Sequence, residues 1–579
     1  MAFLRTSARL CAGVLAVLLG AAACTSGTPA PRASASASAT SSETSVTGTA
    51  GLASTAWRSV PRDQVRDGGT LTLSLDALPQ TYQLNDPNSS LDLQRISNLY
   101  LPSFVRIGAD GSWTADPDYT ASLTVRSQDP QVVELRIAPA ATWSDGTPMT
   151  WHDLAASWHA FNGSDTAYQP ASTAVWQDVK SITRGDDDRD VLITFAKKDA
   201  DWPALLGSVY PSWAVDTPKH FASAWKNGPF APDGATYVSA GPFVVRSIDT
   251  NAGVVTLGRN PRWWGDPARL DTVVFRTVSR DSLGQAFANR ELDAVDVMGM
   301  PDVLTAARAR PSTTVEQSAG TVARQLTLNG ASGVFADPAV RKAFAQVVDR
   351  RVLAEAVLGQ VGAPVQTLGS VIFVPGQQGY ADHASGVLTA SAADARSTLE
   401  ADGWVIGPDG VATKGGTRLT ARFVVPQGAA TVATIAQLVK QQAKAAGFDV
   451  TVQTVPGSDF FSSYVTTDKR NFDVTSFAWI AGAFPIATAE AYFYPADSGS
   501  NYGGVTDQSL GTAWDALNAE LDPAKRLAEA ADVDERALEL FTMVPLFVEP
   551  STWVVRSDLA NYGPSQFQDV RWQDVGYTG

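Results

Sequence analysis

The stretch from residue 141 to residue 158 combines the end of a strand, a tight turn and the start of a helix. Residues 144–146 read Ser-Asp-Gly, in which Asp can hydrogen-bond its own backbone and Gly accepts a positive φ. Thr150 can cap a helix, and Asp153, three residues later, can complete a capping box near the positive end of the helix dipole. The helical spacing of apolar residues up to Trp158 gives this helix one buried face. The stretch therefore predicts a strand-to-helix junction of an α/β protein.

The rest of the chain supports an α/β organisation. Its 579 residues are too many for one hydrophobic core, and the length predicts three or four domains. A strand over 418–425, a helix over 429–446 and a strand over 448–454 form one predicted β-α-β unit. Asp337 followed by Pro338 predicts another helix start, because Asp caps the first turn and Pro lacks an amide hydrogen that would have no partner there.

The N-terminus has the pattern of an export signal. Arg5 and Arg9 flank an apolar run over 10–19 that is too short to span a bilayer. The sequence Ala-Ala-Ala-Cys that ends at Cys24 resembles a bacterial lipobox, which predicts a signal peptide over 1–23 and acylation of Cys24. The alternative is an ordinary cleavage site at which Cys24 is incidental.

A segment rich in Ser, Thr, Ala, Gly and Pro follows Cys24. Such a composition cannot bury apolar surface, so we predict a lipid-anchored flexible linker over 24–67. Cys24 would be the only cysteine left after processing, because Cys11 lies in the signal, and one cysteine can form no internal disulfide. These features predict an exported lipoprotein at the outer face of the cytoplasmic membrane.

Charge and motifs argue against several classes of function. The formal net charge is −15, whereas nucleic acids and anionic membrane surfaces both need a basic face on their partner. His152 and His159 share a helix face, but two turns separate them, which is poor spacing for one metal ion. The sequence has no His-Glu-x-x-His motif, no Gly-x-Ser-x-Gly elbow and no phosphate-binding Gly-rich loop, and its carboxylates are scattered. We therefore predict no catalytic residue, no metal site and no cofactor, with a secreted hydrolase as an alternative.

Three stretches resemble motifs of the family 5 extracellular solute-binding proteins of ABC transporters, the group that includes oligopeptide and dipeptide binders. They are Trp-Ser-Asp-Gly and its helix in 141–158, Arg-Asn-Pro-Arg-Trp-Trp-Gly in 259–265, and Phe-Ala-Asp-Pro-Ala-Val-Arg-Lys-Ala-Phe in 335–344. The resemblance covers the chain from Gly68 onward. It implies an α/β, two-lobed periplasmic-binding-protein-like fold of type II, in its large form with an extra insert domain, with a hinge and an interlobe cleft.

The order of the segments then predicts a division of the chain into lobes. Lobe one is discontinuous and consists of 68–104, 206–325 and 542–579. Residues 105–205 form an insert subdomain of lobe one, and residues 326–541 form lobe two. Because the chain crosses between the lobes more than once, we expect closure by hinge bending.

The resemblance also implies where a solute would bind. Trp479 stands where the family has a tryptophan that commonly faces the ligand, and a core tryptophan at a strand end is the alternative. Peptide binders carry, shortly afterwards, an Asp that pairs with the free amino group of the peptide, and Gly482 occupies that position here. An unpaired buried ammonium is costly, which puts peptides with ordinary N-termini in doubt and leaves room for blocked, cyclic or non-peptide solutes. The other ligand-binding candidates, by position alone, are Tyr82, Asn85, Asn501, Tyr502 and Phe547.

Together these features predict the lipid-anchored solute-binding component of an ABC importer. We expect a monomer that captures a peptide or peptide-like small solute by lobe closure and delivers it to permease and ATPase subunits. Its contact with the membrane would be through the N-terminal lipid, and nucleic acid is not a partner. The alternative is a binding lipoprotein for a non-peptide solute, such as a sugar, a modified or cyclic peptide or a metal chelate, that acts in sensing or scavenging.

Overall fold

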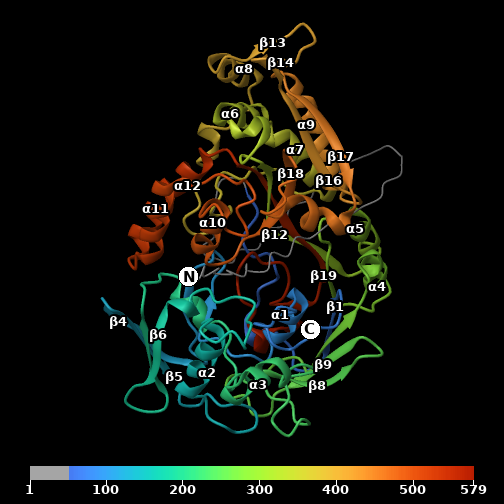
Figure 1. Cartoon of the computed structure of the whole chain (residues 1–579). Helices are drawn as coiled ribbons and strands as arrows, with labels where there is room; N and C mark the ends of the chain where they lie inside the picture. The colour runs from blue at the N-terminus through green and yellow to red at the C-terminus, as the bar shows by residue number, and fades with distance from the viewer. Residues whose placement is uncertain (1–50) are drawn as a thin grey trace.

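Two large hydrophobic clusters organise residues 51–579, which are the residues that the computed structural model describes (Figure 1). The cluster of the lower body in Figure 1 draws on residues from Leu71 to Tyr577, and the cluster of the upper body on residues from Val278 to Val554. The segments that form the two bodies therefore interleave along the sequence. The predicted signal peptide and Cys24 lie outside the described residues.

The lower body contains a four-stranded sheet in the order β1-β10-β9-β8. β1 pairs in parallel with β10, and the other neighbours are antiparallel. Leu71, Leu73 and Leu75 of β1 are buried, as the period of two along a strand requires for a face that packs on a core. The strands are β1 (Thr70–Leu75), β8 (Phe243–Asp249), β9 (Val254–Arg259) and β10 (Thr272–Thr277).

A second sheet of the lower body is antiparallel, in the order β4-β5-β7-β6, and α2 (Trp151–Phe161) packs against it. The predicted start of this helix is confirmed, because Asp153 Oδ2 accepts a hydrogen bond from the Thr150 backbone amide at 3.0 Å. Asp153 Oδ1 accepts another from the Ser212 amide at 2.8 Å. Burial raises the pKa of Asp153 to about 6. The strands are β4 (Thr120–Gln128), β5 (Gln131–Ile137), β6 (Val179–Arg184) and β7 (Asp190–Phe195).

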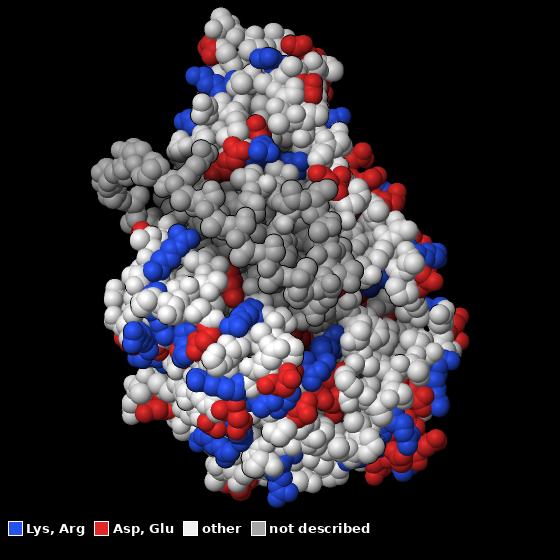
Figure 2. Space-filling view, turned by 180° about the vertical axis from the view of Figure 1, so that it is seen from behind, with Lys and Arg blue, Asp and Glu red and all other residues white. Residues whose placement is uncertain are grey.

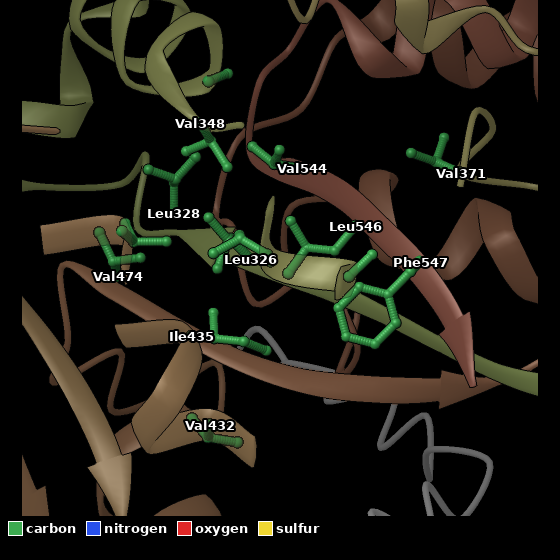
Figure 3. Packing of buried hydrophobic residues seen from close by; sticks show 14 of the residues in the cluster. Leu326, Leu328, Val348, Val371, Val432, Ile435, Val474, Val544, Leu546 and Phe547 are labelled. Carbon is green, nitrogen blue, oxygen red and sulfur yellow. The ribbon is translucent and has the colours of Figure 1, made fainter. Parts of the chain in front are cut away.

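The upper body is built on a six-stranded sheet in the order β11-β19-β12-β18-β16-β17. The predicted β-α-β unit is confirmed: β16 and β17 are parallel neighbours, joined through α9 (Ala430–Lys444). Leu326 and Leu328 of β12 and Val544 of β19 belong to one cluster with Ile435 of α9 (Figure 3). The strands are β11 (Ala294–Asp296), β12 (Thr313–Leu328), β16 (Thr420–Pro426), β17 (Asp449–Val455), β18 (Val474–Ile480) and β19 (Met543–Arg556).

Helices surround this sheet, and one of them starts as predicted: Asp337 Oδ1 accepts a hydrogen bond from the Ala339 amide at 2.9 Å at the start of α6. The hydrophobic cluster of the upper body also includes the start of β19, which the predicted division assigns to lobe one together with the tail. That division of the chain stays a prediction. The helices of the upper body are α4 (Leu283–Ala288), α5 (Pro301–Ala307), α6 (Pro338–Val347), α7 (Arg350–Leu358), α8 (Ala392–Ala401), α9, α10 (Pro485–Phe493), α11 (Gln508–Ala519) and α12 (Pro523–Leu538).

The segment over 51–67 lies along the C-terminal tail and differs here from the predicted flexible linker. The Ala56 amide donates to the carbonyl of Pro564 at 3.1 Å, and the side chain of Asn561 pairs with both the amide and the carbonyl of Val60. The segment also reaches the upper body, because the Ala319 amide of β12 donates to the carbonyl of Ala53 at 2.8 Å. Its backbone groups thus have partners that composition alone could not reveal.

The surface carries both signs of charge. In Figure 2, Lys and Arg side chains alternate with Asp and Glu side chains over the lower body, on the face that the view shows. Within residues 51–579, none of the helices combines the length and the apolar character needed to cross a membrane.

Glu316 of β12 generates a prediction about pH. It lies opposite Trp553 of β19, is 8% exposed, and its carboxylate faces Gly563 in the tail. Burial raises the pKa of Glu316 to about 7, although a hydrogen bond from the Arg58 backbone acts in the other direction. Because the folded pKa lies above the ordinary value of 4.5, stability from this group is fully present below pH 4.5 and is lost as the pH rises through about 7.

We therefore expect Glu316→Gln to be more stable than the wild type above pH 7, by an amount on the order of 3 kcal/mol. Thermal unfolding of both proteins between pH 5 and pH 8 measures this difference. Other buried carboxyls, such as Asp569 with its pKa raised to about 6, contribute equally to the pH dependence of stability in both proteins. A difference between the two proteins that is the same at every pH would contradict the prediction.

Candidate functional site

One face of the six-stranded sheet is turned away from the packed core and bounds a cavity. Because side chains alternate along a strand, Ala323, Gln325 and Thr327 lie on the face of β12 opposite to Leu326 and Leu328. The neighbouring strands place further side chains on the same face. These are Phe477 and Trp479 of β18 and Met543 and Pro545 of β19.

The larger hollow on this face, the outer chamber, is partly open and spans about 490 Å³, open solvent included. Its walls come from β12, β18 and β19, from residues 368–374 and from α10. Among the described residues that line it, none is Asp, Glu, Lys or Arg. This chamber can therefore offer apolar contact and neutral hydrogen bonds, and it has no side-chain charge to pair with a charged group. Its lining includes Gln325, Val371, Ile372, Trp479, Gly482, Tyr492 and Met543.

Trp479 forms the centre of an aromatic wall. Its ring stacks on Tyr492 with the centroids 4.0 Å apart, and it lies parallel to the ring of Tyr502 at 5.7 Å. With the Gln325 amide oxygen turned toward it, Trp479 Nε1 donates a hydrogen bond at 2.7 Å. The indole is 7% exposed, so its orientation is fixed by these neighbours while one part of it still bounds the chamber.

Gly482 lines the same chamber just after the end of β18. A Cβ atom placed on Gly482 would meet nothing within 4 Å, so a side chain at this position would have open space. Its carbonyl accepts a hydrogen bond from Gln377 Nε2 at 2.9 Å, which holds this part of the rim. Residue 482 thus has no charged side chain here, but the space around it could accommodate one.

Asp534 of α12 holds the backbone of the chamber wall. One carboxylate oxygen, Oδ1, accepts hydrogen bonds from Ser370 Oγ at 2.9 Å, from the Val371 amide at 2.8 Å and from the Ile372 amide at 3.1 Å. The other, Oδ2, lies 2.6 Å from His383 Nδ1. Burial raises the pKa of Asp534, while the bond to His383 opposes this change. A single buried side chain therefore positions the turn that carries three lining residues.

The structure brings some of the predicted ligand-binding residues to this site and not others. Trp479 lines both hollows on the sheet face, and Tyr502 stacks beside it. Asn501 is fully buried, and its side-chain amide is used by the backbone: it donates to the carbonyls of Phe493 and Val505.

The remaining three predicted residues lie elsewhere. Phe547 is 0% exposed in the cluster of the upper body, and Tyr82 is 2% exposed in the cluster of the lower body. Asn85 is half-buried, and its carbonyl accepts from the Ala171 amide at 2.6 Å. As ligand contacts, all six residues stay predictions.

Three lining groups were missed from the sequence: Gln325, Tyr492 and the turn over 370–372. The alternation along β12 could have identified Gln325, because it places this polar side chain on the face opposite to the buried Leu326. Within residues 51–579, no three His, Cys, Asp or Glu side chains gather as a possible metal site.

The contacts of Asp534 predict the effect of its removal. Asp534→Ala would leave Ser370 Oγ, two backbone amides and His383 without their acceptor, so we expect a loss of about 3–5 kcal/mol in the free energy of unfolding. Thermal unfolding measures the loss, and amide exchange at 370–372 should accelerate. Asp532→Ala on the same helix is the matched control, because Asp532 is exposed and should cost less than about 0.5 kcal/mol. Equal effects of the two variants would contradict this role.

Comparison with known proteins gives a consistent result. Residues 114–504 match the family model described as bacterial extracellular solute-binding proteins, family 5 middle. The oligopeptide-binding proteins OppA of Mycobacterium tuberculosis and Mycobacterium bovis are 36% identical to the chain over 521 residues, which cover 89% of this chain and 85% of theirs.

Solved structures agree in fold. The periplasmic EDTA-binding protein EppA has a TM-score of 0.79 at 22% identity and covers 92% of this chain and 100% of its own. The oligopeptide-binding protein AppA from Bacillus subtilis, solved with a nonapeptide, has a TM-score of 0.67 at 16% identity and covers 89% of this chain and 100% of its own. The predicted α/β, two-lobed periplasmic-binding-protein fold is confirmed. The family is one of solute-binding proteins and not of enzymes, and this chain belongs to it: it is a bacterial extracellular solute-binding protein of family 5.

Proposed function

We propose that this protein captures a peptide or peptide-like solute in the outer chamber and delivers it to an ABC permease, as a lipid-anchored component of an importer. The observation that carries the proposal is the uncharged, aromatic-walled chamber beside Trp479, in a chain 36% identical to oligopeptide-binding proteins over most of its length.

The chamber favours solutes without a charged group at this point. A buried ammonium or carboxylate without a partner is costly, and the lining described for this chamber offers no opposite charge. A free amino terminus would therefore stay outside the chamber or be absent, as in a blocked or cyclic peptide. Affinity would come from apolar contact and from hydrogen bonds to backbone groups and to neutral side chains such as Gln325.

A metal chelate is the second candidate, because a structural neighbour is named for EDTA binding. EDTA and its complexes are rich in carboxylates, which Lys or Arg would normally hold. Since neither residue lines the chamber in the described chain, we rank a polyanionic chelate below a neutral peptide-like solute.

Native mass spectrometry of the protein purified from its source tests the proposal directly. We expect a co-purifying neutral solute, such as a peptide without a free amine, at one per protein molecule. A co-purifying chelate or sugar would reject the peptide assignment and leave the binding role. Chemical turnover of the bound solute would reject the binding role itself.

Gly482→Asp should create a preference for free amines. The open space at this position admits a carboxylate, and a charge-assisted hydrogen bond of about 1.5–3 kcal/mol corresponds to a gain of roughly ten- to a hundredfold in affinity. Calorimetric titration with a tetrapeptide amide that has a free amino terminus and uncharged side chains, and with its N-acetylated form, measures the ratio. Gly482→Asn is the matched control, because it has nearly the same size without the charge. No change in the ratio for the Asp variant would show that the amino terminus does not approach residue 482.

A further inference from the structure

The upper and lower bodies touch at two places near the outer chamber. At the first, the Gln378 amide of the upper body donates a hydrogen bond to the carbonyl of Asp110 in the lower body at 2.8 Å. At the second, the Ala200 amide of the lower body donates to the carbonyl of Asn518 in the upper body, also at 2.8 Å. The residues of the lower body between these two contacts are therefore candidates to meet a solute at the chamber.

The first contact lies in the turn between β2 (Val105–Ile107) and β3 (Trp113–Ala115) of the lower body. A Cβ atom placed on Gly111 in this turn would lie 3.3 Å from Gln377 Nε2 of the upper body. Gln377 Nε2 in turn donates to the carbonyl of Gly482 at 2.9 Å. One side chain of the upper body therefore separates this turn from the rim of the chamber.

The second contact is joined to another part of the chamber wall. Asn518 belongs to α11, and its Nδ2 donates at 2.7 Å to Oε2 of Glu490 on α10, the helix that lines the chamber. Figure 1 shows α10 and α11 in the part of the upper body that faces the lower body. Ala200 comes two residues before the 3₁₀ helix η3 (Trp202–Leu206) of the lower body. The two contacts thus reach the chamber lining at Gly482 and at α10, respectively.

Trp113 of the lower body connects the two contacts. It follows Gly111 by two residues, and its ring packs edge-on against the ring of Trp202, the first residue of η3, with the centroids 5.2 Å apart. Trp202 is 6% exposed and forms a fixed support, whereas Trp113 is 37% exposed. Ile480, which lines the chamber, is 39% exposed. Both bodies therefore present apolar surface to water close to the place where they meet, and such surface often marks a ligand groove.

We propose that Trp113 is the contact that the lower body makes with the solute, and that it selects a neutral apolar group, such as a phenylalanine or leucine side chain. This inference rests on the proposed function and names the half of the site that the outer chamber lacks. Four residues of an extended peptide span about 13 Å. Since Gln377 alone separates Gly482 from the turn before Trp113, one peptide of this length can touch the chamber and Trp113 together.

A contact with Trp113 also links binding to closure. The residues that line the outer chamber belong to the upper body alone, so a solute makes those contacts in the open and in the closed form. Contact with Trp113 is made only when the lower body approaches, and it therefore adds affinity for the closed form alone. The flat indole face offers a large apolar area at a small cost in conformational entropy, because its orientation is already supported by Trp202.

The test uses the full protein and N-acetylated tetrapeptide amides in which phenylalanine, leucine, alanine or lysine occupies each position in turn. At one position we expect the wild type to bind the phenylalanine and leucine peptides about tenfold more tightly than the alanine peptide, with lysine no tighter than alanine. Trp113→Ala should lower the affinity for the phenylalanine peptide to that for the alanine peptide, and Trp113→Phe should retain most of the preference.

A second measurement separates contact with the solute from a merely structural role. In hydroxyl-radical footprinting, saturation with the phenylalanine peptide should protect Trp113 from oxidation. Val125 is the control, because it is 40% exposed on the edge strand β4 of the lower body and should stay equally reactive. Val125→Ala, which also removes exposed apolar surface, should leave the peptide preference unchanged.

Four outcomes would overturn the inference and leave the proposed function standing. They are the absence of an apolar preference in the wild type, an unchanged ratio of phenylalanine to alanine affinity in Trp113→Ala, an equal change in Val125→Ala, and tightest binding of the lysine peptide. Full reactivity of Trp113 in the saturated protein would also overturn it. Failure of every peptide to bind the wild type would overturn both the inference and the proposed function.

Discussion

The antiparallel pairing of β12 with β19 carries both the core and the cavity of the upper body. The pairing extends from Thr313 opposite Arg556 to Thr327 opposite Met543, and its register shifts twice along the way. One face packs Leu326 and Val544 into the hydrophobic cluster, while the other face presents Gln325 and Met543 to the outer chamber. Since the period of a strand is two, a slip of one residue would exchange the two faces and lose the core and the cavity together.

A close backbone approach interrupts this pairing at Gly320. A Cβ atom at that position would lie 1.8 Å from the carbonyl oxygen of Glu549, so the chain can pass only with glycine there. The Gly320 carbonyl accepts a hydrogen bond from Gln566 Nε2 at 2.8 Å, and the neighbouring Ala319 amide is bound by Ala53. The irregularity thus places the N-terminal segment and the C-terminal tail against the strand that bounds the cavity.

Local sequence predicted the parts of this molecule that local contacts determine. The cap at Asp153, the cap at Asp337 and the unit formed by β16, α9 and β17 all depend on residues close together in the chain. The turn over 370–372 could not be read in this way, because it is held by Asp534, more than 160 residues away. The same limit applies to Asn501, whose polar side chain suggested a ligand contact although nearby carbonyls use it.

The family resemblance pointed to individual candidate site residues, which hydrophobic periodicity alone could not do. How far such a resemblance reaches depends on how the side chains pack. Trp479 was singled out from a motif, and the structure gives it a position in the cavity wall. Tyr82 and Phe547 were selected by position alone, and both lie in hydrophobic clusters, where large apolar side chains are most often found. A motif fixes the place of a residue along a strand, whereas the direction of a side chain depends on packing against distant segments.

A contact between the two bodies, away from the cavity, is relevant to the proposal that the protein captures its solute by lobe closure. Arg526 of α12 pairs with Asp201 of the lower body at 2.6 Å, and their side chains are 13% and 4% exposed. Asp201 Oδ2 and Arg526 Nη2 have no further hydrogen-bond partner in the described residues. The cost of desolvating such a pair offsets most of the attraction between its charges. The pair therefore fixes how the two bodies meet and contributes little net free energy to their contact. Under the proposed function, a solute shifts the equilibrium between the open and closed forms only as far as it binds the closed form more tightly than the open form. Since the residues that line the chamber beside Trp479 all come from the upper body, that preference requires contacts of the solute with the lower body as well.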